Sequence, residues 1–282
     1  MKYLPTLIFL IIFHLGQAQN RNELRFIEHL NNKGSFKEVI HLIQSDSCSY
    51  NQNQRDSLFF YRGWAHYSIK NLNQSTESFL NVGKESPFYL KSRFFAGYNQ
   101  LFLEKYDQSR NIFEQINIQD EGQKSLLNFE LSGINMLKGE WVQARDQLKK
   151  IKPDIAILSK QLLVLEDICK DQDSRKSKSR FLAGLMSGIV PGSGKIYAGK
   201  TGEGIASMIA TAGFGLITWE NWHKLGLNNF KTIFFGSIFA ATYISNIYGS
   251  VISVKIIENN YQNAIHNQIL FQLHIPLRNF FE

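Results

Sequence analysis

The chain has 282 residues, 44% of them hydrophobic, and 31 Lys and Arg stand against 24 Asp and Glu. The hydrophobic share excludes an intrinsically disordered chain, two cysteines exclude a disulfide scaffold, and 20 Gly with 5 Pro exclude a collagen-like or low-complexity chain. The length suits about two domains. Four basic residues fall in one short run: Arg175, Lys176, Lys178 and Arg180. Because this basic charge is local and does not follow a docking surface, we expect no nucleic-acid binding.

Residues 1–18 have the pattern of a secretory signal peptide. Lys2 precedes an apolar run over 3–15, and the small residues Gly16 and Ala18 suit cleavage after Ala18. The run is shorter than the roughly 20 residues that span a bilayer, although an uncleaved anchor is the alternative. In either case the following segment is exported, which predicts a periplasmic domain. Cys48 and Cys169 lie at opposite ends of that segment, and we favour two unpaired thiols.

The segment 19–170 contains a repeat with a period near 34. Gly63 and Gly97 are 34 positions apart, as are Phe79 and Phe113; a third copy follows at a spacing of 35 and a degenerate first copy precedes at 36. This period predicts pairs of helices that bury their apolar faces against neighbouring pairs. The expected repeat-core positions are Gly63, Tyr67, Phe79, Gly97, Leu101, Tyr106, Phe113, Trp141, Ala144 and Leu148.

This pattern resembles the tetratricopeptide repeat over about 20–150. A small residue lies in each first helix, an aromatic residue opens the second, and an apolar residue follows late in it. Ser75 and Ser109 replace the family's usual alanine, and the proline between repeats is mostly missing. The resemblance implies an array that binds a protein partner, which is analogy at the level of the fold.

Five aromatic residues of the repeats allow two interpretations. They could line a peptide-binding groove, or they could pack in the core, and the spacing favours the core for Tyr67 and Trp141. The five are Trp64, Tyr67, Phe94, Tyr98 and Trp141.

Residues 171–180 contain no apolar residue and are interpreted as a solvated basic linker before a membrane domain at 181–282. Two uncharged apolar runs predict spans at about 204–220 and 232–254, with Trp219 and Trp222 at the interface. An amphipathic helix over 255–275 is expected to end near Pro276.

Small residues recur at every fourth position of the second run. Such a stripe predicts close packing against the first span. Its members are Ser237, Ala241, Ser245 and Gly249.

The membrane topology stays open from the sequence. With two spans the C-terminal tail returns to the side of the repeats. If 181–197 forms a third span, the tail ends on the opposite side. We favour two spans plus an interfacial or re-entrant first segment.

Residues 194–201 match the phosphate-loop pattern G-x-x-x-x-G-K-[ST] letter for letter. A true phosphate loop follows a buried strand and cradles phosphates with its backbone N–H groups. Here Pro191 and Gly192 break the lead-in and an apolar run follows, so we expect no nucleotide despite the match.

The same segment fits a second signature better. Residues 187–200 resemble the P-G-x-G-x-x-Y-x-G signature of a family of bacterial membrane domains without assigned chemistry. The matching residues are Pro191, Gly192, Gly194, Tyr197 and Gly199. The resemblance covers about 180–265 and implies an interfacial turn ahead of a helical hairpin, in contact with the lipid bilayer.

The expected protein is all-α, with a helix-turn-helix repeat solenoid followed by a transmembrane helical hairpin. No catalytic, cofactor-binding or metal-binding residues stand out, so we predict no enzyme and no cofactor. The favoured function is an inner-membrane adaptor whose periplasmic repeats bind a protein partner. The alternatives are an envelope assembly or transport component whose membrane half is the active part, and a nucleotide-dependent enzyme.

Overall fold

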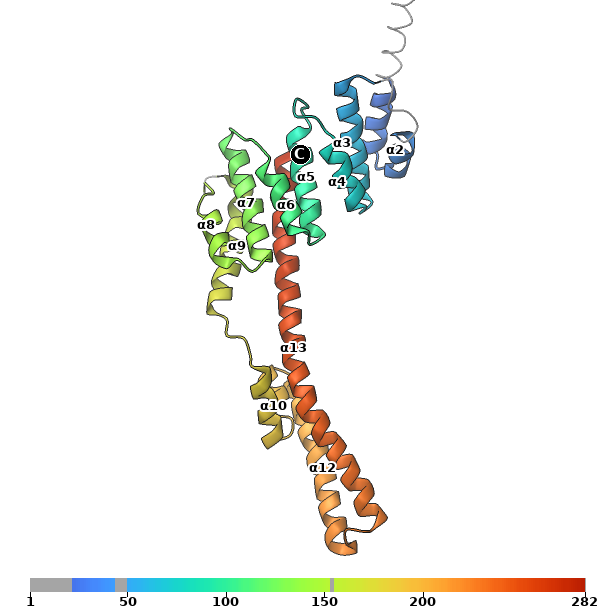
Figure 1. Cartoon of the computed structure of the whole chain (residues 1–282), viewed down its shortest axis with the longest axis vertical. Coiled ribbons are helices and arrows are strands. Elements are labelled where there is room, and N and C mark those ends of the chain that lie inside the picture. Colours follow the sequence, from blue (N-terminus) through green and yellow to red (C-terminus); the bar gives the residue numbers. More distant parts are fainter. Residues whose placement is uncertain (1–21, 44–49, 153–154, 282) are drawn as a thin grey trace, which may run out of the picture. The chain divides into compact units, whose positions relative to one another are not determined.

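A computed structural model describes residues 22–43, 50–152 and 155–281, and all secondary structure in these ranges is helical (Figure 1). The expected signal peptide and Cys48 lie outside the described residues. The chain divides into two compact units, one of residues 1–170 and 269–282, the other of residues 171–268.

The first unit contains a helix over 22–32 followed by helices α2 to α9, of which α2 to α8 pack each on the next along the chain. Their bounds are α2 Phe36–Ile43, α3 Gln52–Ser68, α4 Leu72–Leu80, α5 Tyr89–Phe102, α6 Tyr106–Glu114, α7 Glu121–Leu137, α8 Trp141–Leu148 and α9 Ala156–Ser174. Helix α9 contains buried Cys169 and runs four residues into the segment expected to be a linker, so the non-helical connection is only 175–179.

Equivalent contacts recur in successive helix pairs of this unit. A Cβ placed on Gly63 would lie 2.6 Å from the Phe79 ring, and one on Gly97 would lie 2.5 Å from the Phe113 ring. A side chain there would collide with the ring that fills the space between the two helices. Glycine is therefore required by close approach at both positions.

The serines at equivalent positions of two successive helix pairs have a hydrogen-bonding role. The Ser75 hydroxyl donates to the Gly63 carbonyl at 2.8 Å, and the Ser109 hydroxyl donates to the Gly97 carbonyl at the same distance. Asn99 adds a bond between pairs, from its Nδ2 to the Ser75 hydroxyl at 2.9 Å. Each serine thus ties the second helix of its pair to the glycine of the first.

A left-handed residue closes the first helix of each pair. The backbone φ angle is +81° at Gly34, +65° at Lys70, +60° at Glu104 and +76° at Gly139. These positions are separated by 36, 34 and 35 residues, which are the spacings read from the sequence. In all four turns the N–H of the left-handed residue and the N–H of the next residue donate back to the helix end, which is the Schellman pattern.

Eight of the ten expected repeat-core residues are buried, and two are not. Tyr106 and Trp141 are half-buried because each is the first residue of its helix, α6 or α8.

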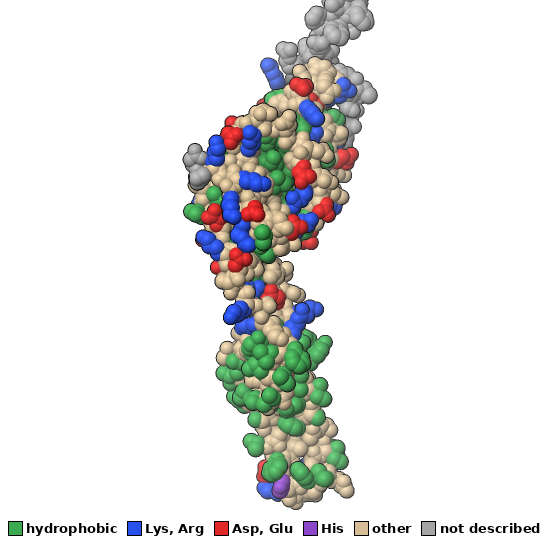
Figure 2. Space-filling view, turned by 60° about the vertical axis from the view of Figure 1, so that its left-hand side comes forward, with side chains coloured by type: hydrophobic (Ala, Val, Ile, Leu, Met, Phe, Trp, Pro, Cys, Tyr) green, Lys and Arg blue, Asp and Glu red, His purple; other side chains and the backbone are tan. Residues whose placement is uncertain are grey.

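The second unit contains three apolar helices and most of a fourth. Their bounds are α10 Arg180–Ile189, α11 Ser193–Ala198, α12 Thr201–Leu225 and α13 Phe230–Phe281. Hydrophobic side chains gather on this unit, with charged side chains at its two ends (Figure 2). Of the helices described, α13 alone is long and apolar enough to cross a membrane, judged by length and composition.

The C-terminal region differs from the expectation in two respects. First, α13 does not end near Pro276 but continues through it to Phe281. Proline removes one helical hydrogen bond, but Leu273 and Leu277 on either side of it are fully buried, and this packing carries the helix onward. Second, residues 269–282 belong to the helical array and not to the membrane domain predicted at 181–282.

Candidate functional sites

The C-terminal segment of α13 packs against the helices of the array. The Tyr98 hydroxyl donates to the Leu270 carbonyl at 3.2 Å, and the Tyr67 hydroxyl hydrogen-bonds with Nε2 of His274. The rings of Phe94 and Phe281 lie 5.5 Å apart. This answers the question left open for the aromatics, because Tyr67, Phe94 and Tyr98 are buried against helices of the same chain.

Helix α7 also makes room for this segment. A Cβ placed on Gly133 would lie 2.3 Å from a methyl carbon of Leu273, and the Leu273 side chain is fully buried. The close approach of α7 and α13 therefore depends on glycine at 133. The space that a bound peptide would occupy beside these aromatics is filled by the protein's own residues 269–281.

A neutral polar cluster lies in this packed region. Burial raises the pKa of Glu130 well above its ordinary value, and among the described residues no donor reaches either carboxylate oxygen. Burial also raises the pKa of Tyr98 and, to about 12, that of Tyr67, while it lowers the pKa of His274. Uncharged forms are favoured at all four positions, so the cluster holds the segment in place without an ionised nucleophile or base.

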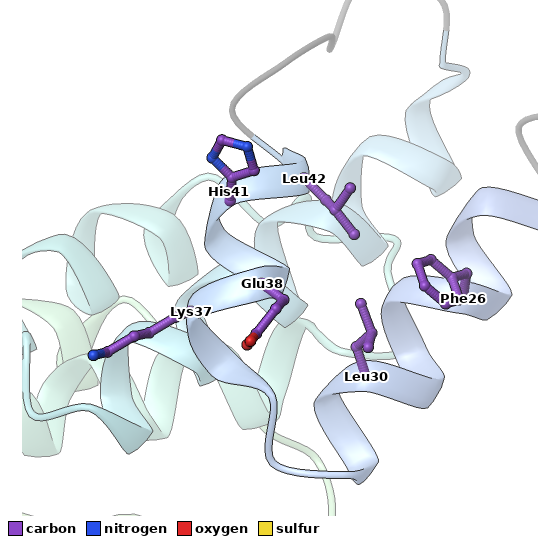
Figure 3. A pocket seen from close by; sticks show the side chains of 6 residues that line it. All are labelled: Phe26, Leu30, Lys37, Glu38, His41 and Leu42. Carbon is purple, nitrogen blue, oxygen red and sulfur yellow. The ribbon is translucent and has the colours of Figure 1, made fainter.

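An apolar hollow lies at the N-terminal end of the array, between the helix over 22–32 and α2 (Figure 3). Its volume is about 460 Å³, and Phe26, Leu30 and Leu42 provide its apolar lining, with Lys37, Glu38 and His41 at its edge. Phe26 is 53% exposed. A large exposed phenyl ring beside a hollow is typical of a surface that receives an apolar side chain.

The Pro-Gly motif makes a turn in which backbones almost touch. Gly192 has a φ of +89°, and a Cβ there would lie 2.2 Å from the Gly204 carbonyl oxygen. A Cβ on Gly194 would lie 1.9 Å from the carbonyl oxygen of Ala183. Only glycine fits these positions, so the motif determines how α10, α11 and α12 pack.

Tyr197 has a contact that the sequence did not reveal. Its hydroxyl accepts the backbone N–H of Ser179 at 3.1 Å, and Ser179 caps the N-terminus of α10. The Lys178 ammonium donates to the Ala198 carbonyl at 3.2 Å. The tyrosine therefore ties the end of α11 to the start of α10.

The phosphate-loop match is a helix–turn–helix. Residues 194–198 lie in α11, Gly199 is the left-handed residue that ends it, and α12 begins at Thr201. The N–H groups of Ile196, Gly199 and Lys200 donate to carbonyls of the same segment, and the Lys200 ammonium pairs with Glu203 at 2.8 Å. These groups of the matched segment are engaged within the protein.

The predicted stripe of small residues is not buried in the contact between the two helices. Ser237, Ala241 and Ser245 are exposed, and only Gly249 is half-buried. The contact between α12 and α13 uses a neighbouring face, where Gly215 approaches the Phe239 ring and Asn246 hydrogen-bonds with Thr211. The four-residue period is correct for a helix, but it does not say which neighbouring face is buried.

Asn246 and Glu130 were not singled out from the sequence. Asn246 is visible as an amide within an uncharged apolar run. Glu130 carries no such signal, because only the tertiary structure buries it. In the described part of the chain, no three His, Cys, Asp or Glu side chains gather in a way that could hold a metal ion. No protein-family description, curated protein or solved structure matches this chain.

Proposed function

We propose that this chain is an exported, membrane-anchored helical-repeat adaptor, without catalytic activity of its own, that holds a protein partner at the periplasmic face of the inner membrane. The recurring glycine–phenylalanine contacts and the four left-handed turns support a solenoid of the tetratricopeptide type. The Pro-Gly turn ahead of α12 supports the resemblance to the family of bacterial membrane domains.

One observation carries this proposal. Helix α13 begins in the apolar unit, where it is long and apolar enough to span a membrane, and its residues 269–281 are packed within the helical array. Insertion of α13 would therefore attach the array to the bilayer without any separate linker at that end.

The same observation favours one of the topologies. Residues 22–170 and 269–281 share one unit, which supports a placement of both on the same side of a membrane. An even number of spans would then separate them. We infer that α13 forms one span, that α12, whose 25 residues are long enough but less apolar, forms the other, and that α10, with only 10 residues, stays at the interface.

The partner must bind elsewhere than the aromatic surface covered by residues 269–281. The hollow beside Phe26 and Leu42 lies near the N-terminal end of the described array and is apolar with charged groups at its edge. An amphipathic helix with one large apolar side chain suits such a surface.

A second candidate keeps the membrane half as the active part, in envelope assembly or transport. Its support is the polar pairing inside the apolar unit, where the buried hydroxyls of Ser187 and Ser250 lie 2.6 Å apart. The two candidates differ in which half of the protein the cell requires for its function.

The test uses full-length chains with single cysteines at Gly213 in α12, at Asn228 in the α12–α13 loop and at Glu114 in the array. Each new cysteine is placed in a chain from which Cys48 and Cys169 have been removed. A membrane-impermeant thiol reagent, applied to intact spheroplasts that contain this protein, should label position 114. Position 228 should be labelled only after lysis, and position 213 should stay protected. Labelling of 228 from outside, or recovery of the chain in the soluble fraction, would contradict the proposal. Phe26→Asp, with Phe102→Asp as its exposed control, then tests whether function depends on the hollow.

A further inference from the structure

The 171–268 unit contains an open cleft between α12 and α13 with a polar floor. Its volume is about 290 Å³. Small residues of α13, Ala241 and Ser245, form one wall, and Ser207 and Thr211 of α12 form the other. Lys195 of α11 and Asn246 of α13 also line it. Two residues of the exposed stripe, Ala241 and Ser245, therefore line a cleft.

Asn246 lines this cleft and carries a buried acceptor without a partner. The residue is only 4% exposed, and its Nδ2 donates to the Thr211 hydroxyl at 2.6 Å and to the Ser207 carbonyl at 3.4 Å. Because a carbonyl can only accept, the amide nitrogen must face Ser207. The Oδ1 atom is left without a donor among the described residues. An unpaired buried acceptor is unfavourable, and a ligand with an N–H or O–H group would supply the missing donor.

Lys195 adds a positive charge at one end of the cleft. Its ammonium donates to the Ser207 hydroxyl at 2.6 Å, and its Cε lies so close to Gly249 that a Cβ there would be 3.2 Å away. No carboxylate pairs with Lys195 in the described ranges, unlike Lys200, which pairs with Glu203. A phosphate suits an ammonium that lacks a carboxylate partner.

The order of these two groups along the helices restricts the ligand. Gly249 follows Asn246 by three residues, so Lys195 lies about 4.5 Å nearer than Asn246 to the end of the hairpin where α12 begins. If α12 and α13 span the membrane, a ligand phosphate at Lys195 lies toward the headgroups. A hydrogen-bond donor of the same ligand would then lie directly below the phosphate, toward the acyl chains and at the depth of Asn246.

We propose that this cleft binds an anionic lipid with a phosphate at Lys195 and an amide or hydroxyl donor of its backbone at Asn246. A diacylglycerol backbone offers only ester acceptors at that depth, whereas a sphingoid backbone offers an amide N–H and a hydroxyl directly below the phosphate. This inference rests on the proposed membrane insertion of α12 and α13. A second copy of the chain fits less well, because a symmetric pair would bring two Lys195 ammonium groups toward one another.

The test compares two probe lipids that share a phosphomonoester and differ in backbone, ceramide 1-phosphate and phosphatidic acid. Full-length protein in detergent is titrated with each, and bound lipid is counted by native mass spectrometry while the thermal midpoint is followed. Ceramide 1-phosphate should bind at least tenfold more tightly than phosphatidic acid, and uncharged ceramide should bind weakly.

Matched variants locate the effect. Ser245→Leu, which fills the cleft, should abolish the preference for ceramide 1-phosphate. Lys195→Gln, which removes the charge that both probe lipids would use, should weaken the binding of both. Ser237→Leu, two turns away on the same stripe, and Lys200→Gln should retain both the preference and the binding. A preference that survives Ser245→Leu, or binding of both lipids that Lys195→Gln leaves unchanged, would overturn the assignment of the cleft.

Three further outcomes would overturn the inference in distinguishable ways. Equal binding of both probe lipids, by protein that still floats with phosphatidylcholine vesicles, would refute the lipid site and leave membrane anchoring intact. An equal thermal shift with inorganic phosphate alone would assign a soluble anion. Protein that does not float with any vesicles would refute the anchoring proposal and this inference together.

Discussion

The hydroxyl of Tyr98 donates a hydrogen bond to the backbone carbonyl of Leu270 at 3.2 Å, joining residues 172 positions apart in the chain. Tyr98 lies one turn before the end of α5, and Leu270 lies in the part of α13 that belongs to the helical array. The bond joins the C-terminal segment of the chain to the array. Residues 269–281 are therefore part of the packing of the array, which the repeat pattern does not indicate.

Leu273→Ala tests this packing of the C-terminal segment. Leu273 is fully buried against Gly133, so removing its side chain should cost about 2–5 kcal/mol of unfolding free energy. Phe271→Ala is the control, because Phe271 is 62% exposed on the same helix and its loss should change stability by about 0.5 kcal/mol or less. Thermal and denaturant unfolding of both proteins measures the difference. Equal stabilities would show that the C-terminal segment contributes nothing to the array.

Phe113→Ala tests the contact that recurs between repeats. The ring lies over Gly97 and is fully buried, so we expect a loss of about 3–5 kcal/mol. Phe102→Ala, at a position 51% exposed in the neighbouring helix α5, is the matched control. A circular dichroism melt that is unchanged by Phe113→Ala would remove Phe113 from the core of the repeats.

Glu130→Gln tests the neutral state of the buried carboxyl. Since burial raises the folded pKa above the ordinary value of 4.5, the stability that Glu130 contributes is complete below pH 4.5 and declines as pH rises toward the folded pKa. The decline has a slope of about 1.4 kcal/mol per pH unit. Glutamine resembles the protonated carboxyl and cannot ionise, so the variant should gain stability over the parent as pH rises from about 5 to 8. Unfolding curves at several pH values measure this gain, and parallel profiles for the two proteins would contradict a neutral Glu130.

Gly194→Ala tests the turn ahead of α12. The new methyl group would lie 1.9 Å from the Ala183 carbonyl oxygen, so α10 and α11 cannot keep their packing, and we expect a loss of several kcal/mol or failure to accumulate. Gly202→Ala is the control, because no atom lies within 4 Å of its Cβ, and the helix should gain roughly 0.5–1 kcal/mol. Thermal unfolding in detergent compares the two. Equal behaviour would mean that the turn is a passive connection.

Lys200→Ala tests the phosphate-loop match. The N–H groups of this segment already donate within the protein and Lys200 pairs with Glu203, so ATP and GTP should not bind at millimolar concentration with magnesium. Equilibrium dialysis with labelled nucleotide measures this for the parent and the variant. Magnesium-dependent nucleotide binding that Lys200→Ala abolishes would support the alternative function of a nucleotide-dependent enzyme.

Local rules predicted much of the all-helical fold. The period of 34–36 residues located the glycine–phenylalanine pairs and the starts of α4, α6 and α8, because a repeat reports on contacts between residues close in sequence. The Pro-Gly motif located the turn before α12, because positive φ angles and close backbone approach leave little choice besides glycine.

The tertiary structure decided what long-range packing controls. Proline at 276 predicts a helix end, yet the burial of Leu273 and Leu277 outweighs the lost hydrogen bond and carries α13 to Phe281. The helical period of Ser237, Ala241 and Ser245 identified one face of α13, but it did not indicate which face packs against α12. Ala241 and Ser245 line a cleft, and Asn246 on the adjacent face contacts α12. Local patterns in the amino-acid sequence indicated most of the helical segments and the turns between them. The packing of residues 269–281 into the array depends on side chains more than a hundred residues apart, and no local pattern records which of them will meet.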